Sequence, residues 1–133
     1  MSLKTGDWKM NQDGIETKLS INTVVANGTV TGQLSTAGIL PGGAGVNFLA
    51  GLWDETSRTL TFAFPHTVQL TEQPRYFYKG FLFSTPRTPT PGIDVVWTLA
   101  GYVEVWDNGV AEFNGGNARR NVFGWFAQIT EVA

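Results

Sequence analysis

The chain has 133 residues, a length that fits one domain, and we expect residues 1–133 to form it. Its strand-forming residues are interrupted by 16 Gly and 6 Pro, and no stretch keeps apolar residues at helical spacing for long. A net charge of -2 provides no basic stripe for nucleic acid or an anionic membrane, and the lack of Cys excludes thiol catalysis, disulfides and Cys-based metal sites.

No apolar run approaches the length needed to cross a membrane, and no charged-then-apolar leader peptide is visible. We therefore expect a soluble protein, and the sequence leaves its compartment open.

Short segments with strand composition recur along the chain, and residues typical of turns separate them. In chain order they cover residues 6–11, 15–25, 29–35, 46–55, 59–64, 75–84, 93–106 and 121–132. The Asn27-Gly28 pair predicts a tight hairpin, because Asn and Gly accept the positive φ angles that such a turn needs. The Gly-rich segment 37–45 predicts a mobile loop, and the prolines at 86, 89 and 91 predict a stiff connection outside the sheet.

The short links between these segments favour an up-and-down antiparallel order. Closing such a sheet removes its unpaired edges, so we predict an all-β fold, an eight-stranded antiparallel up-and-down β-barrel. A sandwich of two four-stranded sheets is the alternative. An eight-stranded barrel has an interior just wide enough for packed side chains or for one small ligand. Gly6-Asp7-Trp8 at the first strand predicts that the Trp8 indole closes the bottom of this cup.

The residues offer little enzymatic chemistry. His66 is the one histidine and follows Pro65 at a strand end, which is typical of a solvated surface residue. No Ser or Thr stands in the context of a nucleophile elbow, and the scattered carboxylates do not supply a metal site. We expect no catalytic residue, no bound metal and no cofactor, so the chain is more readily explained as a binding protein than as an enzyme.

The aromatic residues of the last three strands fall on both faces of the sheet. On the strand at 75–84 the pattern places Tyr76, Tyr78, Gly80 and Leu82 inside and Phe77, Phe81 and Phe83 outside. On the last strand we place Phe126 inside. Val96, Ala100, Tyr102 and Trp106 add to the outer face. Soluble monomers rarely expose such a patch, so we expect a homo-oligomer, a dimer or tetramer, built through these strands; a monomer whose loops cover the patch is the alternative.

Several short motifs, taken in order, resemble the avidin/streptavidin family over nearly the whole chain. The motifs are Gly6 to Gly14 at the first strand, Gly28-Thr29-Val30-Thr31-Gly32-Gln33-Leu34, Phe48 to Asp54, Tyr78-Lys79-Gly80, Val96-Trp97-Thr98-Leu99 and Val122-Phe123-Gly124. The Gly-rich segment 37–45 occupies the place of the family's ligand-covering loop. The resemblance implies an eight-stranded barrel, a homotetramer, and biotin at the open end. Lipocalins, which are calycin barrels, share the Gly-x-Trp start but usually run longer.

Carried over residue by residue, the resemblance implies a changed binding site. Asn11 matches the asparagine that bonds the ureido oxygen of biotin, Thr36 matches a nearby serine, and Trp97 keeps the aromatic wall. Tyr76 and Tyr78 sit where a threonine and a tryptophan are expected. Ile15, Leu34 and Phe126 replace a serine, a tyrosine and an aspartate that bind biotin. Because a ligand whose polar atoms stay unpaired binds poorly, we do not expect tight binding of biotin.

The sequence therefore predicts a non-enzymatic barrel that binds a small, mostly apolar molecule. The residues expected to surround that ligand are Asn11, Leu34, Thr36, Phe62, Phe64, Tyr76, Tyr78, Trp97 and Phe126. Two alternatives stay open. One is a structural or interaction protein with a filled barrel, and the other is a cyclase or isomerase of a hydrophobic substrate, similar in architecture to allene-oxide-cyclase barrels, which would need a buried Asp or Glu.

Overall fold

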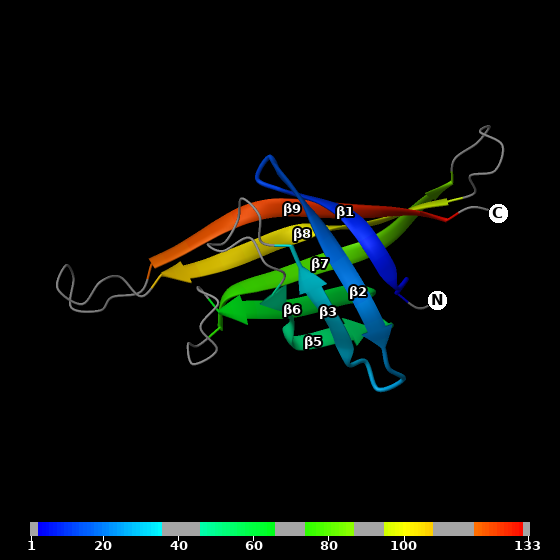
Figure 1. Cartoon of the computed structure of the whole chain (residues 1–133), viewed down its shortest axis with the longest axis horizontal. Helices are drawn as coiled ribbons and strands as arrows, with labels where there is room; N and C mark the ends of the chain where they lie inside the picture. The colour runs from blue at the N-terminus through cyan, green and yellow to red at the C-terminus, as the bar shows by residue number, and fades with distance from the viewer. Residues whose placement is uncertain (1–2, 36–45, 66–73, 87–94, 108–118, 132–133) are drawn as a thin grey trace.

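The computed structural model describes residues 3–35, 46–65, 74–86, 95–107 and 119–131 (Figure 1). These residues form strands joined by turns, and no helix among them is long and apolar enough to cross a membrane. The strands are β1 Gly6–Gln12, β2 Ile15–Val24, β3 Val30–Leu34, β4 Val46–Asn47, β5 Leu49–Asp54, β6 Thr59–Pro65, β7 Pro74–Pro86, β8 Val95–Asp107 and β9 Arg119–Glu131. Thr36, His66 and the predicted loop 37–45 lie outside the described residues.

All strands belong to one antiparallel sheet in the order β4-β3-β2-β1-β9-β8-β7-β6-β5. Only Phe48 separates β4 from β5, so the two are halves of one bent strand, and the sheet contains eight strands. Its first half pairs with β3 and its second half with β6, which brings the two edges of the sheet together. The prediction of an eight-stranded up-and-down barrel is confirmed, and the barrel is nearly closed (Figure 1).

The seam of the barrel lies between β3 and β5. A bridge joins Thr29 to Leu52, and the backbone N–H of Trp53 donates to the carbonyl oxygen of Gly28 over 2.7 Å. A bulge centred on Ala50, whose φ is 51°, breaks the regular pairing of β5. Gly51 permits the close approach, because a Cβ there would lie 2.2 Å from the carbonyl oxygen of Val30.

The two ends of the barrel differ in what fills them. We call the end where β1 begins and β9 ends the closed end, and the opposite end, where β1 turns into β2, the mouth (Figure 1). Trp8, Trp53 and Trp97 are buried at the closed end. Their indole N–H groups donate, in that order, to the Lys4 carbonyl oxygen at 3.1 Å, a Glu55 carboxylate oxygen at 2.7 Å and a Glu131 carboxylate oxygen at 2.7 Å. Each large ring therefore closes the barrel without leaving its polar atom unpaired.

The faces of β7 agree with the sequence pattern. Tyr78, Gly80 and Leu82 are buried in the interior, while Phe77, Phe81 and Phe83 are exposed on the outer face. On β8, Ala100 and Tyr102 also lie on the outer face, whereas Val96 is buried. The side chain of Trp106 lies outside the described residues.

The predicted orientation of β9 is wrong. Trp125 and Ala127 are buried in the interior, and Phe126 is 46% exposed on the outer face. Both faces of this strand are apolar, so alternation alone could not choose between two registers that differ by one residue. The interior accepts Trp125 because glycines face it on the neighbouring strands: Gly101 pairs with Trp125, and Gly80 pairs with Gly101.

Candidate functional site

Four aromatic rings fill the barrel interior between the buried tryptophans of the closed end and the mouth. Phe48 stacks on Phe62 with ring centroids 4.2 Å apart, and Phe62 stacks on Tyr78 at 4.7 Å. Trp125 meets Phe62 and Tyr78 edge-on, at 6.1 Å and 5.9 Å. We call Phe48, Phe62, Tyr78 and Trp125 the aromatic plug. The plug makes the middle of the barrel a packed core, so a ligand has no room to lie among these rings.

Gln12 is the polar group at one edge of the plug. It shares the inward face of β1 with Trp8 and Met10 and is only 7% exposed. The Tyr78 hydroxyl donates a hydrogen bond to Oε1 of Gln12. Burial, and to a lesser degree the nearby Tyr76, raises the pKa of Tyr78, so this hydroxyl keeps its proton. Among the described residues no group accepts a hydrogen bond from the Gln12 amide nitrogen.

Three half-buried side chains on the adjacent strands β7, β8 and β9 lie on the mouth side of the plug. Tyr76 and Val105 face each other across β7 and β8, and Phe123 pairs with Val103 across β8 and β9. Tyr76, Val105 and Phe123 pack against the core while remaining partly exposed. We call Tyr76, Val105 and Phe123 the collar. The collar, the plug and Gln12 form an inward-facing surface that is apolar apart from the Gln12 amide, the hydroxyls of Tyr76 and Tyr78, and the Trp125 indole N–H, which donates to the Tyr102 carbonyl oxygen.

The structure brings some of the predicted site residues together. Phe62 and Tyr78 are buried in the plug, Tyr76 is in the collar, and Leu34 is buried at the mouth end of β3. Trp97 is buried at the closed end instead. It lies six residues along β8 from Val103, the partner of Tyr78, a separation of roughly 20 Å along the strand. The Phe64 side chain and Thr36 lie outside the described residues.

Two predicted site residues face away from the interior. Asn11 lies on the outer face of β1, where its Oδ1 accepts a hydrogen bond from the backbone N–H of Gly14 over 3.0 Å. This bond stabilises the tight turn at Asp13 and Gly14, both of which have positive φ. Phe126 is on the outer face of β9. The prediction that these two residues line the interior is therefore wrong.

Five residues of the site were not predicted from the sequence: Gln12, Phe48, Val105, Phe123 and Trp125. For Gln12 a signal was present, because residues 8, 10 and 12 of one strand share a face and Trp8 fixes that face as inward. Phe48 carries no such signal, since it lies at the break between β4 and β5, where the alternation is interrupted.

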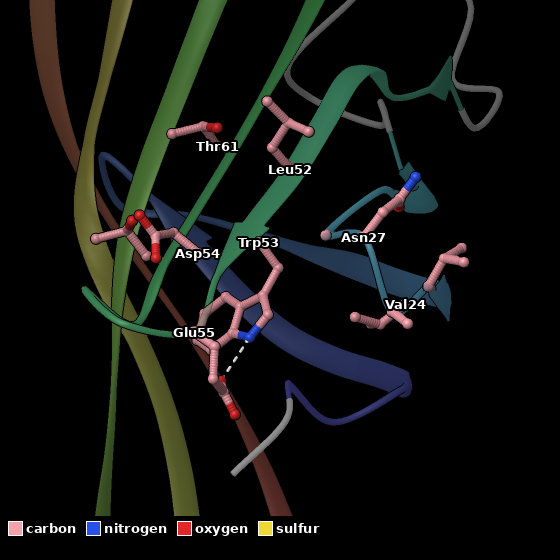
Figure 2. A pocket seen from close by; sticks show the side chains of 11 residues that line it. Val24, Asn27, Leu52, Trp53, Asp54, Glu55 and Thr61 are labelled. Atoms are coloured by element: carbon pink, nitrogen blue, oxygen red, sulfur yellow. Dashed lines mark hydrogen bonds between the residues drawn. The ribbon is translucent and has the colours of Figure 1, made fainter.

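Three hollows formed by described residues lie on the outside of the barrel. The largest, of 680 Å³, lies at the seam between the turn at 25–28 and the strands β5 and β6 (Figure 2). Asp54 and Glu55 line this hollow. Asp54 accepts hydrogen bonds from the backbone N–H groups of Ser57 and Thr56, and these two bonds hold the pKa of Asp54 below its usual range. The others measure 580 Å³, beside Lys79 and Tyr102, and 340 Å³, beside Lys9 and Phe126. Asp54 thus serves the turn that contains it, and its carboxylate is already engaged by backbone donors.

The described residues include no group of three or more His, Cys, Asp or Glu side chains that could hold a metal ion. Their buried polar side chains are Gln12, Thr59 and Thr98, none of which is a carboxylate. The chain matches no protein-family model, and no curated protein and no solved structure is significantly similar to it.

Proposed function

We propose that this protein is a non-enzymatic binding barrel that holds a small, mostly apolar molecule at its mouth. The observation that carries this proposal is the collar: Tyr76, Val105 and Phe123 face inward over the packed plug yet remain partly exposed. Inward-facing apolar side chains at the end of a barrel gain free energy when a ligand removes them from water. The ligand in this proposal rests on the plug and does not pass through it.

The proposed relation to the avidin family is compatible with a ligand at the mouth, but it does not favour biotin as that ligand. The eight-stranded barrel and the Trp8 floor agree with what the resemblance implies. The positions implied for polar biotin contacts are apolar at the buried Leu34 and outward-facing at Phe126. A polar ligand head with few partners loses the hydrogen bonds it makes in water, so we propose a mostly apolar ligand in preference to tightly bound biotin.

Tryptophan fluorescence tests this function, because Trp125 belongs to the plug. We expect titration with 2-acetylnaphthalene to quench the emission in a saturable way, and titration with 1-decanol to shift its maximum. Biotin should produce a weak response or none. If neither apolar probe changes the emission, the barrel is a filled structural core and the proposal is wrong.

A second candidate function rests on the outer face of β7, β8 and β9. Phe81, Ala100 and Phe126 lie side by side across these strands, and Phe83 and Tyr102 extend the row. The four aromatic side chains among them are 36% to 47% exposed. We propose that a second copy of the chain covers this outer aromatic row, since soluble proteins seldom leave so large a continuous apolar surface in water.

The cyclase or isomerase alternative has less support. It needs a carboxylate inside the cup, and the buried polar side chains of the described residues are an amide and two hydroxyls beside the Tyr78 phenol. A phenol whose pKa is raised by burial is a poor general base near neutral pH.

A further inference from the structure

We infer that the ligand carries a neutral hydrogen-bond acceptor, such as a ketone or amide carbonyl, that accepts from the Gln12 amide while its flat apolar body lies against the plug and collar. This inference rests on the proposed binding function and adds the ligand's chemical class. It also assigns Gln12 as the residue that determines specificity, with Tyr78 as the residue that positions it.

Gln12 has unfilled hydrogen-bonding capacity. A glutamine side chain offers two donors and one acceptor oxygen, and here only the oxygen has a partner among the described residues. The residue is 7% exposed in an interior that is otherwise largely apolar. The amide nitrogen keeps some access to solvent, since it is not one of the fully buried unpaired polar atoms of the described residues, and a ligand carbonyl at the mouth would take the place of water there.

Tyr78 fixes the direction of the Gln12 amide. The Tyr78 hydroxyl has one proton, and it donates that proton to Oε1 of Gln12. Tyr78 is itself held between the Phe62 ring and the edge of Trp125. Because Oε1 is turned toward a fixed hydroxyl, the amide nitrogen is turned away from it, so the group presented to a ligand is a donor and selects an acceptor.

The buried side chains of the described interior favour a neutral ligand head. The side chains buried in the described interior are apolar, amide, hydroxyl or phenol groups, and none is ionised near neutral pH. An ionic ligand head beside Gln12 would lose its hydration without gaining an opposite charge from the buried side chains of the described residues, which disfavours fatty acids and amines. A neutral carbonyl gains the Gln12 hydrogen bond at a much smaller desolvation cost.

A matched pair of probes tests this inference. 2-Acetylnaphthalene carries a carbonyl, and 2-isopropenylnaphthalene has nearly the same shape with a methylene group in place of the oxygen. We expect the native protein to bind the ketone about five-fold more tightly, the difference that one neutral hydrogen bond supplies. In Gln12→Met the ketone should lose this advantage, while the hydrocarbon binds at least as well as before.

A second variant covers the case in which Gln12→Met does not fold. Tyr78→Phe keeps the stacked ring but frees the Gln12 amide to rotate, so it should reduce the preference for the ketone while both probes still bind. Equal affinities of the native protein for the two probes, or a preference that survives in both variants, would overturn the inference and leave the binding function intact. If neither probe binds the native protein, both the binding function and the inference are wrong.

Discussion

The Trp125 ring lies directly over the backbone of Gly80, so that a Cβ built on Gly80 would be 2.6 Å from two atoms of the indole. The ring occupies this space because Gly80 has no side chain, and its edge then supports both Phe62 and Tyr78. The absence of one side chain on β7 thus makes room for the plug on which the proposed ligand rests.

We predict that Gly80→Ala destabilises the fold by about 1–3 kcal/mol, the usual cost of forcing an extra methyl group into a packed core. Urea denaturation followed by circular dichroism measures the free energy of unfolding. Gly124→Ala is the matched control, because Gly124 lies on β9, two strands from β7, with the nearest atom 4.0 Å from a built Cβ. That substitution should change stability by less than about 0.5 kcal/mol. Equal effects of the two alanines would show that Trp125 does not need the space over Gly80.

The carboxylate of Glu131 predicts a pH-dependent contribution to stability at the closed end. The Trp97 indole N–H, and then the Lys4 ammonium at 3.0 Å, hold the pKa of Glu131 below its ordinary value of 4.5. A lowered pKa means that the folded state binds this proton more weakly than the unfolded state does. The stabilisation is therefore present above the ordinary value and is lost as the pH falls through the folded value.

We expect Glu131→Gln to lower Tm at about pH 7, with a difference from the native protein that shrinks as the pH falls toward about 3. Glu16→Gln removes an exposed carboxylate on β2 and should not reproduce this pattern. A Tm difference for Glu131→Gln that stays constant over the whole range would contradict the assignment.

The outer aromatic row makes a prediction about assembly. If a second copy covers the row, Phe126→Lys places a charge in the middle of the contact, because Phe126 pairs with Ala100 and Ala100 with Phe81. We predict an assembled native protein and a monomeric Phe126→Lys variant by sedimentation equilibrium. Val25→Lys, at an apolar residue that is 50% exposed in the turn after β2, should leave the mass unchanged. A native protein that sediments as a monomer would refute the second candidate function.

The barrel followed from the sequence because strong turn signals separate segments of strand composition. The β7 faces were predictable for the same reason, since Gly80 and Lys79 distinguish the two sides of that strand. On β9 the two sides are equally apolar, and the choice between Trp125 and Phe126 depends on the empty space over Gly80, which no local pattern reveals.

The candidate site was harder to predict than the fold. Asn11 matched a family position but lies one residue out of phase with Trp8, and its side chain stabilises the Asp13-Gly14 turn instead. Gln12, in phase with Trp8, occupies the interior. The location of Trp97 at the closed end depends on the register between β8 and its neighbours, which the sequence alone does not fix.

The most direct test of ligand binding at the mouth is a ¹⁵N–¹H correlation spectrum of the native protein titrated with 2-acetylnaphthalene. The Gln12 side-chain amide and the Trp125 indole N–H report on the plug, and the indole N–H groups of Trp8, Trp53 and Trp97 report on the closed end. We predict saturable shifts of the first two signals and little change in the other three. Unchanged Gln12 and Trp125 signals, or shifts confined to the closed end, would contradict the account.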